Sequence, residues 1–244
     1  MYPDNIHIGT SGWHYPDWVG PFYPRGMKEA EFLPYYARHL STVEINNTFY
    51  HLPTHETLTH WRDEIPEDFL FTCKASRYIT HMKKLKDPKE SIERFFESVT
   101  VLQHKLGPML FQLPPRWKKN VSRLEAFLIA LPTGFRYAFE FLDASWFDEE
   151  IYQLLMAHHA AFCLYHLAGQ WSPEVVTGNF IYIRLHGPQD SYEGKYHQHQ
   201  LRTWTTKCRK WSHSGKDVYC YFDNDELGFA PINALALLKY VKAD

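Results

Sequence analysis

The chain has 244 residues, about the length of one closed α/β barrel, and its 45% hydrophobic and 22% charged residues are typical of a globular protein. Its formal net charge of −2 excludes a general attraction to nucleic acid or to an anionic membrane. No segment approaches the apolar length of a membrane span and no secretory leader is visible, so we expect a cytoplasmic protein whose four cysteines are reduced.

Short runs rich in β-branched and aromatic residues recur along the whole chain and predict eight strands. Several of these runs are almost continuously apolar, as strands covered on both faces require. In chain order, the predicted strands are Ile6–Thr10, Thr42–Asn46, Phe69–Lys74, Met109–Leu113, Tyr137–Phe141, Ala161–His166, Phe180–His186 and Val218–Asp223.

Segments with helical periodicity lie between these strands. The gap from 167 to 179 contains Gly169, Pro173 and Gly178, so we expect its helix to be short or lost. The clearest predicted helices are Ser91–His104, Leu201–Ser212 and Ile232–Val241, and weaker ones are Ala30–His39, Thr57–Glu64, Arg123–Ala130 and Asp148–His158.

This alternation predicts parallel strands joined by right-handed crossovers. At this length it favours a single domain over residues 1–244, folded as a (β/α)₈ barrel of the TIM type, in the α/β class. No G-x-G-x-x-G motif and no Walker loop is present, which disfavours an open nucleotide-binding sheet.

Polar residues gather where the predicted strands end, which is where closed barrels of this kind place their active sites. Charged residues inside apolar strands are the informative part, because a buried charge is costly unless it is paired. They indicate either an internal salt-bridge network that fills the top of the barrel or an acid/base and anion-binding site, and we favour the second. The polar strand-end and loop residues include Glu44, Asn46, Lys74, His81, Gln112, Glu140, Arg184, His186 and Asn224.

Several strings of residues resemble the YecE-like barrels, a family defined as a domain of unknown function, family 72. The resemblance spans nearly the whole chain and implies a TIM-type barrel, but it implies no reaction. One position departs from the family pattern, since Leu142 stands where an Arg usually follows the Glu-Phe pair. The matching strings include Ile8-Gly9-Thr10-Ser11-Gly12-Trp13, Thr42-Val43-Glu44-Ile45-Asn46-Asn47-Thr48-Phe49-Tyr50, Leu110-Phe111-Gln112-Leu113-Pro114-Pro115, Glu140-Phe141, Arg184-Leu185-His186-Gly187 and Tyr221-Phe222-Asp223-Asn224.

The first functional hypothesis is an isomerase- or hydrolase-type enzyme acting on a small, polar, anionic ligand such as a sugar, phosphosugar or nucleotide fragment. Lys74 and Arg184 would fix negative charge. General base and acid would come from Glu44, Glu140, His186 and His81. Hydroxyl-orienting amides would be Asn46, Gln112 and Asn224, and apolar walls would be Trp13, Tyr50 and Tyr192. No cofactor is expected.

Two alternatives stay open. One is a metal-assisted phosphodiester hydrolase, by analogy with apurinic-endonuclease barrels, whose divalent metal would be held by Glu44, His81, Glu140, His186 and Asp223. Lys74 and Arg184 would repel that metal, and the net charge does not favour nucleic acid as a partner. The other alternative is a barrel that binds a ligand without turnover.

Overall fold

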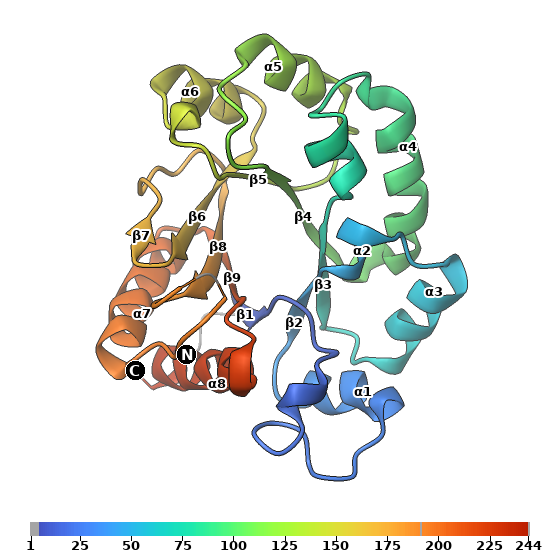
Figure 1. Cartoon of the computed structure of the whole chain (residues 1–244), viewed down its shortest axis with the longest axis vertical. Coiled ribbons are helices and arrows are strands. Elements are labelled where there is room, and N and C mark those ends of the chain that lie inside the picture. Colours follow the sequence, from blue (N-terminus) through green and yellow to red (C-terminus); the bar gives the residue numbers. More distant parts are fainter. Residues whose placement is uncertain (1–4, 191, 244) are drawn as a thin grey trace.

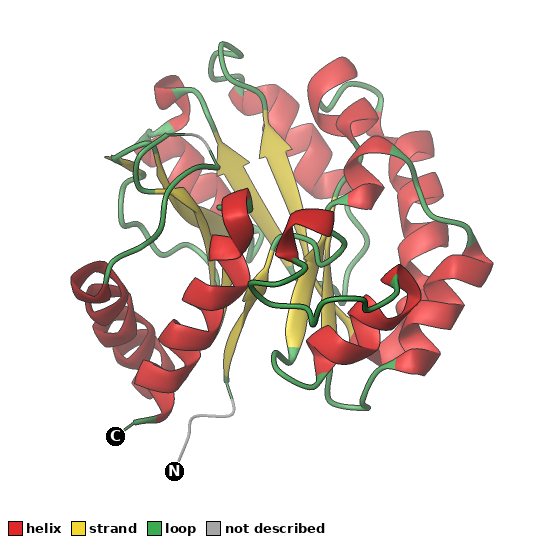
Figure 2. Cartoon of the chain, turned by 60° about the horizontal axis from the view of Figure 1, so that its bottom comes forward, coloured by secondary structure: helices red, strands yellow, loops and turns green. Residues whose placement is uncertain are grey.

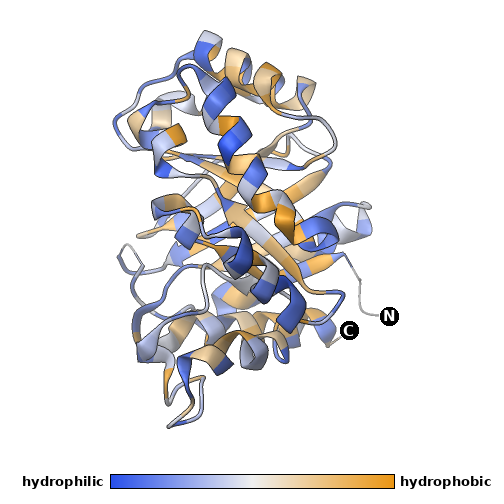
Figure 3. Ribbon diagram, turned by 90° about the vertical axis from the view of Figure 1, so that its right-hand side faces the viewer, coloured by the Kyte–Doolittle hydropathy of each residue, from blue (hydrophilic) through white to orange (hydrophobic). Residues whose placement is uncertain are grey.

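The apolar runs form a central sheet, and helices surround it (Figure 1). The structure is a computed structural model that describes residues 5–190 and 192–243. A view from another side shows strands through the middle of the molecule with helices on the outside (Figure 2). Hydrophobic residues gather along these strands, while the loops are mostly hydrophilic (Figure 3). The strands are β1 Ile6–Thr10, β2 Thr42–Ile45, β3 Leu70–Lys74, β4 Leu106–Leu113, β5 Tyr137–Phe141, β6 Ala161–Leu167, β7 Gln170–Trp171, β8 Phe180–Gly187 and β9 Asp217–Phe222.

The helices follow the strands in alternation, as the sequence predicts. Buried Ile92, Phe95 and Val99 lie on one face of α4, and the ring of Phe95 is 6.3 Å from that of Phe111 on β4. Within the described ranges no helix is long and apolar enough to cross a membrane. The helices are α1 Phe32–Ala37, α2 Asn47–Tyr50, α3 His55–Glu64, α4 Pro88–Val99, α5 Val121–Ala130, α6 Glu149–Ala157, α7 Gln198–His213 and α8 Phe229–Lys242.

The sheet runs in the order β1-β9-β8-β6-β5-β4-β3-β2, with parallel pairing at every step, and β7 pairs antiparallel with β6. The two ends of this order, β1 and β2, meet through a parallel bridge between Ser11 and Glu44. Gly9 allows their close approach, because a Cβ at this position would lie 2.1 Å from the carbonyl oxygen of Thr42. The structure thus confirms a nearly closed barrel of eight parallel strands alternating with helices.

A tyrosine completes the seam between β1 and β2. The hydroxyl of Tyr36, on α1, accepts a hydrogen bond from the backbone N–H of Thr10 at 2.9 Å. It donates to the carbonyl oxygen of Thr42 at 2.9 Å. The Tyr36 side chain is fully buried, so it satisfies backbone groups that a regular ladder would otherwise pair.

The differences from the predicted elements are local. β4 begins at Leu106 rather than Met109, and β2 ends at Ile45 because Asn46 turns the chain into α2. The predicted helix Ser91–His104 begins earlier, at Pro88, and its last turn is 3₁₀ in character, with Gln103 at a φ of 55°. As predicted, the gap between β6 and β8 holds no helix in the described structure and carries only β7.

Candidate functional site

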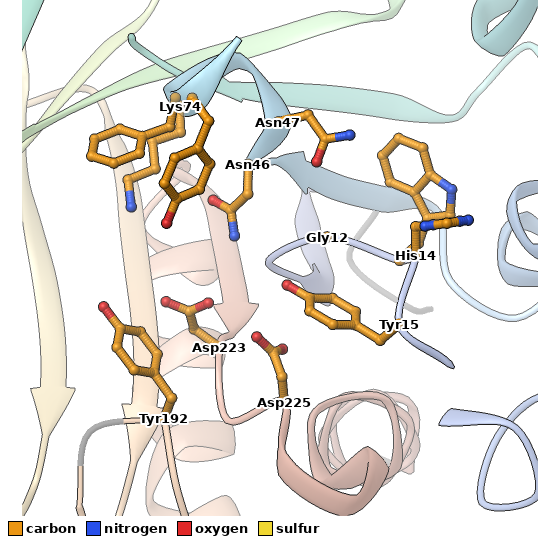
Figure 4. A pocket seen from close by; sticks show the side chains of 12 residues that line it. Gly12, His14, Tyr15, Asn46, Asn47, Lys74, Tyr192, Asp223 and Asp225 are labelled. Atoms are coloured by element: carbon orange, nitrogen blue, oxygen red, sulfur yellow. The ribbon is translucent and has the colours of Figure 1, made fainter. Parts of the chain in front are cut away.

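A cavity of about 400 Å³ lies at the carboxyl ends of the strands (Figure 4). Its ionisable walls come from opposite sides of the barrel, since Lys74 ends β3 while Asp223 and Asp225 follow β9. The lining residues are Gly12, Trp13, His14, Tyr15, Asn46, Asn47, Phe49, Tyr50, Lys74, Tyr192, Asp223 and Asp225. The carboxyl ends of parallel strands thus meet around one opening, as the barrel fold requires.

Several of the predicted strand residues form a buried cluster, which we call the Arg184 network: Arg184, Glu44, Glu140, His186 and Asp223. Of these, Asp223 also lines the cavity and the other four do not. Nη2 of Arg184 lies 2.8 Å from Glu44 and 2.9 Å from Asp223, and Nη1 lies 2.9 Å from Glu140. Nε also donates to Glu44, at 3.1 Å. The side chains of Arg184, Glu44 and Glu140 have no exposed surface.

Other buried polar groups surround the network and satisfy its remaining oxygens. The hydroxyl of Tyr182 donates to Oε2 of Glu44 at 2.6 Å, and the hydroxyl of Ser11 donates to Oε1 of the same carboxylate. The amide of Gln112 donates to Oε2 of Glu140 at 2.7 Å. With these bonds the buried carboxylates are paired, which is what makes such a cluster tolerable in a barrel interior.

His186 connects two carboxylates of the network. Its Nε2 is 2.5 Å from Oε1 of Glu140 and its Nδ1 is 2.8 Å from Oδ2 of Asp223. Burial opposes the charged form, but the charge of Glu140 and the hydrogen bonds to Asp223 and Glu140 together outweigh it and raise the pKa of His186. Burial likewise opposes the charge of Glu140, and Arg184 together with His186 holds the pKa of that carboxyl well below its usual range. The imidazolium can then donate to both neighbours.

Asp223 belongs to the network and to the cavity at the same time. Both hydrogen bonds of its carboxylate to described residues are made by Oδ2, from Arg184 at 2.9 Å and from His186 at 2.8 Å. Arg184 and His186 lower the pKa of Asp223 against the opposing effect of burial. Its carboxylate is therefore ionised and held in a fixed orientation at the cavity wall (Figure 4).

Asp225 lies beside Asp223 in the cavity and has the opposite character. Burial, followed by the charge of Asp223, raises the pKa of Asp225 well above its usual range. Its Oδ1 is buried and has no hydrogen-bond partner among the described residues. The hydroxyl of Tyr15, which also lines the cavity, donates to the carbonyl oxygen of Ser11 at 2.8 Å. Two neighbouring carboxyl groups thus lie at one wall, Asp223 with a lowered pKa and Asp225 with a raised pKa.

Asp225 was not among the site residues predicted from the sequence. Asp225 lies beyond the predicted strand Val218–Asp223 and beyond the end of β9 at Phe222, where the alternation of a strand no longer assigns side chains to one face. Asn224, which was selected, lies elsewhere. It is fully buried, and its amide donates to the carbonyl oxygen of Gly194 and to Asn233.

Lys74 faces the cavity from the opposite wall (Figure 4). Its Nζ lies 4.4 Å from the centre of the Phe49 ring, and in the described part of the chain it has neither a hydrogen bond nor an ion pair. Burial, then the nearby charge of Arg184, lowers the pKa of Lys74. His81, in the π-helical turn Tyr78–Met82, stacks edge-on against Phe49, and burial together with Lys74 lowers its pKa to about 4.

The structure therefore divides the predicted site residues into groups. It corrects the expectation that Arg184 binds a ligand anion, because every guanidinium nitrogen is already bonded within a fully buried cluster. It also corrects the hydroxyl-orienting roles given to Gln112 and Asn224, whose amides are engaged inside the protein. The predicted residues that do line the cavity are Trp13, Asn46, Tyr50, Lys74 and Tyr192.

The residues named for a divalent metal do not gather around an open position. Arg184 occupies the space between Glu44, Glu140 and Asp223, where a cation would have to bind. Over residues 5–190 and 192–243, no group of three or more His, Cys, Asp or Glu side chains is arranged to hold a metal ion. The geometry lends no support to the metal-dependent alternative.

Fold and site together define a (β/α)₈ barrel with a polar cavity at the carboxyl ends of its strands. The chain belongs to the DUF72 family, whose model, described as a protein of unknown function, matches residues 7–244. This confirms the resemblance to the YecE-like barrels seen in the sequence.

Relatives of this chain are found in several bacteria. The UPF0759 protein YecE of Escherichia coli is 32% identical over 136 residues, which cover 55% of this chain and about half, 47%, of that protein. The UPF0759 protein YunF of Bacillus subtilis is 27% identical and the match covers 96% of this chain and 94% of that protein. None of these names states a reaction.

Solved structures agree with the fold. A DUF72 family protein from Thermotoga maritima has a TM-score of 0.87 and 31% identity, over 96% of this chain and 98% of that one. A putative vitamin-B12 independent methionine synthase from Listeria monocytogenes has a TM-score of 0.55 at 7% identity, over 99% of this chain and 96% of that one. The second likeness concerns the barrel fold alone.

Proposed function

We propose that the cavity is the active site of an enzyme that transfers protons on a small, polar molecule such as a sugar, phosphosugar or nucleotide fragment, in an isomerase- or hydrolase-type reaction. One observation carries this proposal. Lys74 faces Asp223 and Asp225 across a cavity of about 400 Å³, while the other charges of the barrel interior are neutralised beneath it. Cavities of this size accommodate such ligands.

Asp225 and Asp223 are the acid and base of this proposal. A pair of carboxyl groups whose pKa values are displaced in opposite directions provides a proton donor and a proton acceptor at the same pH. The pKa of Asp225 is raised by burial and by Asp223, and that of Asp223 is lowered by Arg184 and His186. Glu44 and Glu140, expected as bases from the sequence, are buried in the Arg184 network and are better suited to fix Asp223 in place.

The remaining walls suit a ligand with both apolar faces and hydroxyl groups. Aromatic residues, among them Trp13, Tyr50 and Tyr192, line the cavity. Oδ1 of Asn46 is buried without a hydrogen-bond partner in the described ranges, and it can accept a hydrogen bond from a ligand hydroxyl. Lys74 is the basic side chain that would meet an anionic or carbonyl group of the ligand.

The proposal places the reaction in the cytoplasm, in keeping with four free, buried cysteines. It is tested by incubating the purified protein with a metabolite extract, identifying retained compounds by mass spectrometry, and assaying each for turnover. We expect a compound bearing a sugar or phosphate to be enriched, and its turnover to fall at least about 100-fold in Asp225→Asn, the scale of a lost general acid.

Asp217→Asn is the matched control. Asp217 is a carboxylate at the opposite end of the same strand, β9, where it pairs with Arg136. Its replacement should leave turnover unchanged. Retention without turnover would show a binding barrel rather than an enzyme. Enrichment of no sugar- or phosphate-bearing compound, or full turnover in Asp225→Asn, would remove the basis of the proposal.

A further inference from the structure

Among the described residues, two lysines are buried, and they differ in how their charge is compensated. Lys105, 4% exposed, donates to the carbonyl oxygens of Arg62 at 2.9 Å and Ile65 at 3.0 Å, and lies 3.4 Å from a carboxylate oxygen of Glu67. These contacts are what a buried ammonium group requires, because an unpaired charge is costly away from water. Lys105 therefore has a structural explanation.

Lys74 is buried to a similar degree, at 7% exposed, but lacks such contacts. No carbonyl or carboxylate oxygen of the described residues lies within bonding distance of its Nζ, which rests over the ring of Phe49. The amine instead projects into the cavity, on the side facing Tyr192 and Asp223 (Figure 4). Apart from the contact with the Phe49 ring, the described residues offer the amine no partner that explains why it points into the cavity.

We propose that Lys74 is a nucleophile that forms an imine with the carbonyl carbon of an aldehyde or ketone substrate. The proposal deepens the function proposed above, on which it rests, by naming the substrate class as a carbonyl compound and by using Asp225 as the proton donor. A lysine that is desolvated, or that lies near another cation, is the form of this residue that acts as an amine nucleophile. Burial and the proximity of Arg184 both lower the pKa of Lys74 in this way.

The step balances without an oxidant or reductant. The neutral amine of Lys74 attacks the carbonyl carbon, a C–N bond forms, and the carbonyl π electrons move to oxygen. A proton passes from nitrogen to that oxygen, with Asp225 as the relay, to give a carbinolamine. Asp225 then protonates the hydroxyl, water leaves, and the nitrogen lone pair completes a protonated imine. The products are the iminium on Lys74, one water molecule and the Asp225 carboxylate.

The charge of the iminium is complementary to the carboxylates on the opposite wall of the cavity. Its positive charge lies across the cavity from Asp223, which stays ionised, and from the newly formed carboxylate of Asp225. An iminium withdraws electrons from the neighbouring carbon, so a base on that side can remove a proton there. The geometry thus supplies both the electron sink and the base for an isomerase-type reaction.

Reductive trapping tests this proposal without knowledge of the natural substrate. Purified protein is incubated at neutral pH with pyruvate, dihydroxyacetone phosphate or glycolaldehyde, each with sodium cyanoborohydride, which reduces an imine to a stable secondary amine. Peptide mass spectrometry then locates the adduct. We expect at least one probe to label Lys74 several-fold more than exposed Lys89, because burial and Arg184 lower the pKa of Lys74 and so raise the fraction of its amine that is neutral. Lys105 should stay unlabelled.

Lys74→Arg keeps the positive charge but cannot form an imine, so the single-adduct species in the intact mass spectrum should disappear while thermal melting shows a folded protein. Adducts on surface lysines alone, equal adduct formation in Lys74→Arg, or no adduct with any probe would overturn the proposal. Trapping in Asp225→Asn separates the two proposals. Unchanged labelling of Lys74 in Asp225→Asn would support imine formation and refute Asp225 as the acid. Turnover that depends on Asp225, with no adduct on Lys74 in the parent protein, would support Asp225 as the acid and refute imine formation.

Discussion

Replacement of Arg184 by methionine tests whether the buried network holds the barrel together. The substitution retains an unbranched side chain of similar length but removes the cation that contacts Glu44, Glu140 and Asp223. Removing one partner of a buried charge cluster costs about 3–5 kcal/mol, because the remaining charges are left without compensation. For a chain of this size each kcal/mol lowers the melting temperature by about 2–4 °C, so a decrease of about 6–20 °C is expected.

Arg136→Met is the matched control for this measurement. Arg136 also pairs with a carboxylate, Asp217, but its side chain is 42% exposed. Exposed ion pairs contribute about 0–1 kcal/mol, so this variant should melt within about 4 °C of the parent protein. Both variants are followed by circular dichroism during heating and by urea titration at pH 7. If Arg184→Met is no less stable than Arg136→Met, the network does not contribute the stability assigned to it here.

Three further outcomes follow from the same structure. Tyr36→Phe should cost about 1–3 kcal/mol in urea titration and speed hydrogen exchange at the backbone N–H of Thr10, because the bridge to Thr42 is lost. His81, with a pKa of about 4, should remain neutral at pH 5.5 in an NMR titration of its ring protons, whereas protonation near pH 6.5 would contradict its burial beside a cation. The pKa of Glu140 is lowered in the folded protein, so its stabilising effect is present above its ordinary value of 4.5 and is lost as the pH falls below it. Urea midpoints measured from pH 7 down to pH 3 should therefore decrease, and less so in Glu140→Gln.

The fold was predictable because each strand carries its own signal. Strands buried on both faces need continuous apolar runs, and segments such as Ile6–Thr10 and Tyr137–Phe141 have the predicted bounds. The seam was not predictable, because the hydroxyl of Tyr36 replaces a backbone ladder between β1 and β2 and no local pattern encodes such a contact. The start of β4 also differs from its predicted position, because no local sequence pattern marks where the preceding turn ends.

The candidate site was predictable in place but not in detail. Periodicity and strand ends indicate which side chains meet, and Lys74 and Asn46 do line the cavity. They do not indicate which partners each charge finds, and so Arg184 was expected to hold a ligand although its nitrogens are bonded to carboxylates. Asp225 was missed because it lies beyond the end of β9, where the alternation of a strand no longer applies.

The two interpretations that the sequence left open, a charged plug and a reactive site, apply to different depths of the same barrel. The plug is the Arg184 network, in which Arg184 and His186 compensate buried carboxylates. Asp223 connects the Arg184 network to the cavity. Its Oδ2 is hydrogen-bonded to Arg184 and His186, and the same residue lines the cavity wall. A catalytic base must be ionised and fixed in direction, and the network provides both conditions for Asp223. Burial and the charge of Asp223 raise the pKa of the neighbouring Asp225, so the proposed acid and the proposed base both depend on the same buried cluster.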